Sequence, residues 1–333
     1  MEMGSFGIRL NAWIEKYLSV IVPVSLILGF LLSHYMNSWT AAVPLLFAYL
    51  TFVMATGCSF GQIREAFRMP LPMALTFVLS HIVAPALGYA IGRTAFGAES
   101  PYVVGFVLFA IIPLGVSSVI WVGLSKGHVP LALAMIVIDS ALSPFVIPAA
   151  VELFFGEAIA FDHTKVMLDL VKIIVVPTIL GVLVNELSKQ RFKSWSAPVC
   201  GPTSKLALAV VVMINAAAIE PYVAQMKSDM IVVIPLVVLL VILSYLIGFT
   251  GSVWLRKPDL VIAITYSSGM RNISLGLVLA LAYFEPLTAV PVVLSILIQQ
   301  PMATLNHWLM KKYWRSSLYT KLTGAPPAEQ VRY

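Results

Sequence analysis

The sequence predicts an all-α polytopic membrane protein, and three observations support this prediction. Of the 333 residues, 60% are hydrophobic and only 11% are charged, with a mean hydropathy of +0.94. Soluble domains carry about a quarter charged residues. Ten apolar segments are each long enough to form a spanning helix, and positive charge is unevenly distributed over the loops between them. We therefore expect ten transmembrane helices.

The predicted helices follow one another with short connections. A spanning helix needs about 20 mostly apolar residues, and the segments that meet this requirement are 17–36, 40–59, 71–92, 101–124, 129–154, 164–186, 203–222, 229–254, 259–282 and 286–310. The first five helices fall within 1–155 and the second five within 156–312. The polar tail, 313–333, is expected to be a disordered cytoplasmic segment.

The loop charges predict the orientation. Only Arg93, Lys165 and Lys227 lie on one side of the predicted membrane, whereas all other loop and tail lysines and arginines lie on the other. Because positive loops stay in the cytoplasm, both termini are expected there, in the plasma (inner) membrane. The net charge of +6 fits anionic lipid at the inner leaflet and does not call for nucleic acid.

Polar stretches interrupt the fourth and ninth segments at 112–118 and 266–272. A helix break inside a membrane frees backbone groups that hydrocarbon cannot satisfy, and in transporters such breaks mark the substrate site. The alternative is that proline and glycine only kink two helices, since both are common in membrane helices. The candidate residues of the two breaks are Pro113, Gly115, Ser117, Ser118, Ser267, Ser268, Gly269, Arg271 and Asn272.

The two breaks occupy equivalent places if the chain consists of five helices followed by five more. Because five is odd, the second group would enter the membrane upside down relative to the first. Inverted repeats with paired broken helices are a recurring transporter architecture, in which the site lies where the breaks meet. The sequence therefore predicts a site at these breaks.

The same stretches resemble the bile acid:sodium symporter family. The segment IIPLGVSSVIWVGLSKGHVPLALAMIVIDSALSPFVIP is similar to the family stretch P-G-G-T-A-S-N, which is followed by a lysine-glycine turn and a proline-containing helix. The segment SSGMRNISLGLVLALAYF is similar to the family motif E-x-G-M-Q-N and the helix after it. The resemblance implies ten helices in two inverted repeats. Helices 1, 2, 6 and 7 would form a panel domain and the others a core domain, with helices 4 and 9 unwound and crossing.

The chain departs from the family where the resemblance implies sodium ligands. The family asparagine after Ser118 is Val119, and the helix-5 hydroxyl residues fall on Ala132 and Ile136. The family glutamate is replaced by Ser267 and the glutamine by Arg271, a fixed cation. From these substitutions we expect that sodium coupling is lost or weakened, and we expect no cofactor. The alternative is that the protein remains a sodium-coupled, bile-acid-like symporter.

Arg271 needs a counter-charge or a wet cavity, and Asp139 is its best candidate partner. Asp139 shares a helix face with Ala132, Ile136 and Ser143. The pair could be structural only, or it could act in anion binding or proton coupling. Further candidates are Ser80, where the family's helix-3 glutamine falls, His81 and Asn215, although polar residues such as these also serve as ordinary interhelical contacts. Gln299 and Gln300 are possible core contacts.

These observations predict a secondary transporter for a small organic anion, working by alternating access, and not an enzyme. Half-helices that begin at the breaks would point their positive ends toward a carboxylate or sulfonate. Two alternatives remain. An arsenite-efflux-like permease would place a cysteine near the first break, and the only cysteines here are Cys58 and Cys200. A membrane receptor would bind a ligand without transporting it. The sequence does not indicate the oligomeric state.

Overall fold

The computed structural model describes residues 2–156, 162–222 and 229–314. The described residues outside loops are helical throughout. Seven of the helical segments are long and apolar enough to cross a membrane, or eight if the bent α1 counts as one span. The tail predicted to be disordered lies outside the described residues, apart from Tyr313 and Trp314 at the end of the last helix.

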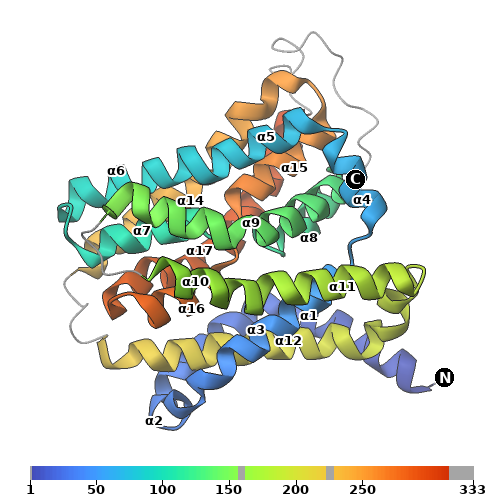
Figure 1. The fold of residues 1–333 in the computed structure, drawn as a ribbon, viewed down its shortest axis with the longest axis horizontal. Helices are drawn as coiled ribbons and strands as arrows, with labels where there is room; N and C mark the ends of the chain where they lie inside the picture. Colours follow the sequence, from blue (N-terminus) through green and yellow to red (C-terminus); the bar gives the residue numbers. More distant parts are fainter. Residues whose placement is uncertain (1, 157–161, 223–228, 315–333) are drawn as a thin grey trace.

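The helices form two groups (Figure 1). The first group packs α1 against α12 and α3 against α11 and α12. Its helices are α1 (Glu2–Leu31), α2 (Ser33–Met36), α3 (Val43–Ala55), α10 (His163–Leu170), α11 (Val176–Leu187) and α12 (Phe192–Ile219).

The second group packs α6 against α7 and α14 against α15 and α17. It consists of α4 (Phe60–Phe67), α5 (Pro70–Val78), α6 (Ala84–Phe96), α7 (Pro101–Ile111), α8 (Ser118–Leu124), α9 (Val129–Phe155), α14 (Met230–Ser252), α15 (Pro258–Gly269), α16 (Ile273–Tyr283) and α17 (Ala289–Trp314).

Helices α7 and α15 lie in the middle of the second group. Every residue of α7 from Tyr102 to Ile111 is buried, as is every residue of α15 from Leu260 to Gly269. Because these stretches are buried on all sides, both helices belong to the core of the protein and do not face lipid. Both helices end at a predicted break. The first break is buried from Ile112 to Gly115 and exposed at Val116, and the second is buried as far as Arg271.

Two spans contain a π-helical turn, η2 (Leu79–Val83) between α5 and α6 and η4 (Val171–Val175) between α10 and α11. Each turn comes just before a proline, Pro85 or Pro177. Because proline has no N–H, the normal bond to the carbonyl four residues earlier is missing, and the helix widens there. The turn η2 carries Ser80 and His81 and therefore helps to place two of the candidate site residues.

Candidate functional site

The first break begins at the end of α7. Ile112 has an extended backbone, with φ −61° and ψ 153°, as expected for a residue before proline. Pro113 cannot donate a backbone hydrogen bond, and helical structure resumes only at Ser118, the first residue of α8. The chain from Ile112 to Ser117 therefore leaves backbone groups that need partners within the protein.

The second break provides those partners. Leu114 and Arg271 form an antiparallel β-bridge. The Gly115 amide donates to the Met270 carbonyl at 2.9 Å, and the Asn272 amide donates to the Pro113 carbonyl at 2.8 Å. The two breaks, about 150 residues apart in sequence, are thus hydrogen-bonded to each other, which satisfies groups that lipid could not.

The side-chain amide groups of two adjacent residues on α17 form hydrogen bonds with the two breaks and with α8. The Gln299 side chain accepts from the Arg271 amide at 2.7 Å and donates to the Arg271 carbonyl at 3.2 Å. The Gln300 side chain donates to the Ser117 hydroxyl at 3.2 Å and accepts from the Trp121 indole at 3.0 Å. The expectation that these glutamines make core contacts is confirmed.

Replacing Gln299 by alanine should destabilise the protein more than replacing Gln300. Gln299→Ala leaves the buried Arg271 amide without an acceptor, at a cost of about 1–3 kcal/mol, whereas the Arg271 carbonyl still accepts from the Ile273 amide at 3.0 Å. Gln300 is only partly buried, so water can replace its contacts. We expect a clear fall in the Tm of purified Gln299→Ala in detergent and a smaller one for Gln300→Ala. Equal Tm values for Gln299→Ala and the wild type would contradict the role given to Gln299.

Asp139 is a buried carboxyl, 1% exposed, in the middle of α9. Its Oδ2 accepts from the Leu114 amide in the first break at 2.7 Å. Its Oδ1 lies 2.6 Å from Nε2 of His81, on the π-helical turn η2. Both carboxyl oxygens thus have a hydrogen-bond partner. Asp139 therefore joins η2, α9 and the first break.

Arg271 brings a positive charge into the same region. Its side chain is 1% exposed, and Nη2 donates to the Ser80 carbonyl at 2.9 Å. Asp139 is the candidate partner of Arg271, but the ion pairs among the described residues do not include a direct one between them. The two groups still interact electrostatically at longer range. The physical reason is that His81 and the Leu114 amide already bind the Asp139 oxygens.

Polar atoms without partners accumulate around this arrangement. Buried side-chain atoms that lack a hydrogen bond include Ser80 Oγ, His81 Nδ1, Ser118 Oγ, Ser267 Oγ, Ser268 Oγ, and Arg271 Nε and Nη1. More than about 90% of buried polar groups in proteins have a partner, so each exception needs an explanation. Most of the partnerless atoms among the described residues belong to the two breaks and to the turn η2, whose Ser80 carbonyl binds Arg271.

The structure brings most of the predicted site residues together. The hydrogen bonds and the β-bridge connect Ser80, His81, Asp139, both breaks and Gln299. Ser117 and Asn272 stand immediately before α8 and α16, but neither side chain caps its helix. Asn215 is different: it is buried on α12 in the first group, its Nδ2 has no partner, and no hydrogen bond connects it to the breaks.

A second polar network escaped the sequence-based prediction. The Ser125 hydroxyl lies 3.1 Å from the Tyr266 hydroxyl and 2.7 Å from Nδ1 of His307. The ring of Trp121 stacks on Tyr266 with a centroid distance of 6.3 Å. Trp121 lies in α8 and Ser125 directly follows it, whereas Tyr266 belongs to α15 and His307 to α17. These contacts attach α8, the helix after the first break, to α15 and α17. No sequence spacing indicates contacts between such distant segments.

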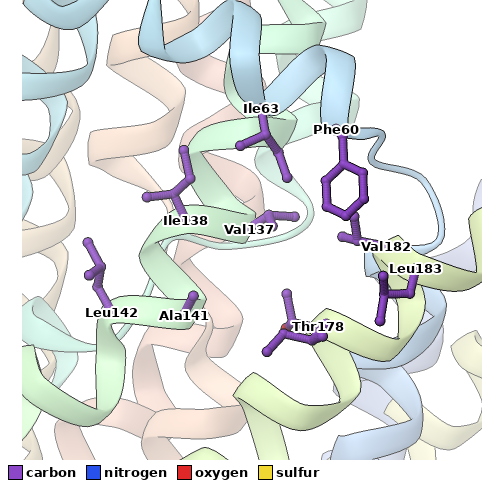
Figure 2. Close-up of a pocket in the computed structure, with 10 residues that line it drawn as sticks. Phe60, Ile63, Val137, Ile138, Ala141, Leu142, Thr178, Val182 and Leu183 are labelled. Atoms are coloured by element: carbon purple, nitrogen blue, oxygen red, sulfur yellow. The ribbon is translucent and has the colours of Figure 1, made fainter. Parts of the chain in front are cut away.

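An apolar cleft separates the second group from α11 (Figure 2). It has a volume of about 270 Å³ and lies between α4 and α9 on one side and α11 on the other. Its lining from α9 includes Val137, Ile138 and Ala141, whereas Asp139 is buried on a different face of the same helix. Helix α9 therefore has the polar site on one face and the cleft on another.

The comparisons with known proteins identify the family. The model of the "Sodium Bile acid symporter family" matches residues 43–226, more than half of the chain. The chain belongs to the sodium bile acid symporter family. It is therefore an integral membrane transport protein and not an enzyme, as its sequence predicts.

Several curated relatives extend over most of the chain. "Uncharacterized protein YbaS" of Bacillus subtilis (strain 168) is 32% identical over 295 residues, 88% of this chain and 96% of the relative. "Uncharacterized sodium-dependent transporter YocS" of the same organism is 24% identical, covering 95% of this chain and 96% of the relative. "Probable sodium/metabolite cotransporter BASS2, chloroplastic" of Oryza sativa subsp. japonica is 25% identical, covering 85% and 68%.

These relatives bear on the question of sodium. Two of the three names refer to sodium-dependent transport. The expectation that this chain has lost sodium coupling is not supported by them, and the alternative of sodium-coupled transport is favoured. The substitutions that led to the expectation concerned side chains only, and backbone carbonyls of an unwound helix also bind sodium.

Proposed function

We propose that this protein is a sodium-dependent secondary transporter that moves a small organic anion by alternating access where the two breaks meet. The observation that carries the proposal is the cluster of buried, partnerless polar atoms at hydrogen-bonded helix breaks, around the positive charge of Arg271. Binding sites of secondary transporters lie at such breaks near the membrane midplane. Family membership and the names of the relatives supply the sodium dependence.

The proposal includes an architecture. Counting α7 with α8 and α15 with α16 as two broken spans adds two to the eight long ones and gives the ten predicted helices. We infer two inverted repeats, over 1–155 and 156–312, with helices 4 and 9 crossing at the breaks. The group of α1, α3, α11 and α12 would be the panel domain and the other group the core. The loop charges place both termini in the cytoplasm.

The apolar cleft would be the route by which the substrate reaches the breaks. Ala141→Trp places a large side chain in this cleft, and we expect the variant to fold and to lose most of its uptake activity. Leu153→Trp is the matched control, because Leu153 lies on the same helix and is 80% exposed. Unchanged uptake by Ala141→Trp, at equal amounts of reconstituted protein, would show that the cleft is not on the route.

A second candidate function is transport of the same kind of anion without sodium. The observation that favours it is the buried guanidinium of Arg271, since a fixed positive charge repels a cation strongly where the dielectric constant is low. This candidate differs from the first only in the coupling ion. One experiment therefore separates the two.

The experiment measures uptake by proteoliposomes that contain the purified protein. Labelled lactate, benzenesulfonate and cholate serve as probes, and the outside solution contains either sodium or choline. We expect uptake of at least one probe, at a higher rate in sodium. Equal rates in sodium and choline would favour the second candidate. Binding of the probes without uptake would contradict transport and indicate a receptor.

A further inference from the structure

His81 and Asp139 form a buried pair that the transport of an anion alone does not require. We propose that His81 Nδ1 is a proton-binding site, and that a proton there and an organic anion at Arg271 bind cooperatively. This inference rests on the proposed function, because it takes the anion site to be at the breaks. The proton would act as an additional coupling or regulatory ion.

The geometry determines which nitrogen takes up the proton. An ionised carboxylate only accepts hydrogen bonds, so Nε2 of His81 must donate to Asp139 across their 2.6 Å contact. Neutral histidine carries one N–H, which leaves Nδ1 as a bare acceptor. Nδ1 is buried and has no partner in the structure. A proton taken up by His81 therefore goes to Nδ1, while the carboxylate keeps the ring in place.

Few other charges surround the pair. The second break contributes Arg271, and the first contributes only the Leu114 amide. From α14 the hydroxyl of Tyr245 donates to the Gln299 carbonyl at 3.4 Å, and Gln299 on α17 is uncharged.

Two ion pairs among the described residues lie near the ends of α9. His128 lies 3.9 Å from Glu65 of α4, and Glu152 lies 2.9 Å from His163 of α10. The charge of the cluster is therefore set by His81, Asp139 and Arg271.

Charge balance links the proton to the anion. With neutral His81, the negative Asp139 and the positive Arg271 sum to zero. A proton on His81 makes the sum +1, which is unfavourable in a buried site, and a bound anion restores neutrality. The free Nε and Nη1 of Arg271 and the hydroxyls of Ser267 and Ser268 are available as donors. The proton must then strengthen anion binding by the same factor by which the anion strengthens proton binding.

Histidine NMR of the full chain in lipid nanodiscs tests this directly. The protein contains five histidines, and His81→Gln identifies the ¹⁵N signals of His81. The signals are followed as the pH is lowered, to detect a proton arriving at Nδ1 of His81. Benzenesulfonate, lactate or cholate should move its midpoint upward by about one unit, a tenfold coupling. The midpoints of the other histidines should not move, and Arg271→Gln should abolish the shift.

Either of two NMR results would overturn the inference: no protonation of His81 Nδ1 at any pH at which the protein stays folded, or a midpoint that none of the three anions moves. Uptake measurements separate this failure from failure of the proposed function. We expect the uptake rate to rise with acidity, a rise that His81→Gln removes and the matched control His163→Gln keeps. Sodium-stimulated uptake that does not depend on pH would overturn the proton site and leave the proposed function standing. Anion-linked titration without uptake would overturn only the proposed function.

Discussion

Replacing Arg271 with glutamine is expected to reduce the uptake of organic anions about tenfold to a hundredfold. Hydrogen bonds from a charged donor are worth about 1.5–3 kcal/mol, and each 1.4 kcal/mol corresponds to about a tenfold change in binding. Glutamine also removes a positive charge that interacts with the buried Asp139. The measurement is the initial rate of uptake by proteoliposomes over a range of probe concentrations.

Arg271→Lys is the matched variant, since it keeps the positive charge and loses the guanidinium fork. A lysine provides one point charge and cannot donate to the Ser80 carbonyl and to an anion with the same geometry. We expect partial recovery of uptake relative to Arg271→Gln. A folded Arg271→Gln protein with wild-type uptake would contradict a role of Arg271 in binding. Loss of folding in both variants would assign Arg271 a structural role only.

Replacing Gly115 with alanine is expected to abolish uptake and lower the Tm. A Cβ atom at Gly115 would lie 2.8 Å from the carbonyl oxygen of Arg271 and 3.0 Å from its carbonyl carbon. These are backbone atoms, and the Gly115 amide is itself bonded to the Met270 carbonyl, so neither break can move away without losing hydrogen bonds. Overpacking of this kind costs about 1–3 kcal/mol.

Gly123→Ala provides the control within the same predicted span. A Cβ atom at Gly123 would meet only the side chain of Val129, at 3.6 Å, which is an ordinary contact. We expect this variant to keep both the Tm and the uptake of the wild type. If Gly115→Ala behaved in the same way, the close approach of the two breaks would have no functional importance.

The helices and their breaks were predictable because they depend on local chemistry. Apolar segments of sufficient length indicate spans, and in the described residues seven helical segments, or eight with the bent α1, are long and apolar enough to cross a membrane. Pro113 interrupts a helix through its own geometry, and the second break follows Gly269, where a Cβ atom would clash with the ring of Tyr245. The helix face that contains Asp139, Ala132 and Ile136 also follows from periodicity, and all three residues are buried.

The contacts that define the site depend on packing between distant segments. His81 and Asp139 are 58 residues apart, and nothing near either residue indicates that they meet. Arg271 binds the backbone carbonyl of Ser80, and every residue carries such a carbonyl, so no side-chain pattern could identify this partner. The π-helical turn that positions His81 depends on a change of hydrogen-bond register, for which Pro85 is the only local signal.

Concentrative uptake by proteoliposomes tests the central claim most directly, because only a coupled transporter accumulates its substrate above equilibrium. The wild-type protein and Gly115→Ala are reconstituted at equal protein-to-lipid ratios, with an inward sodium gradient and labelled lactate, benzenesulfonate and cholate. We predict accumulation of a probe above its outside concentration by the wild type, its collapse when gramicidin dissipates the gradient, and none with Gly115→Ala. Uptake that only equilibrates, or equal accumulation by both proteins, would contradict coupled transport at the two breaks.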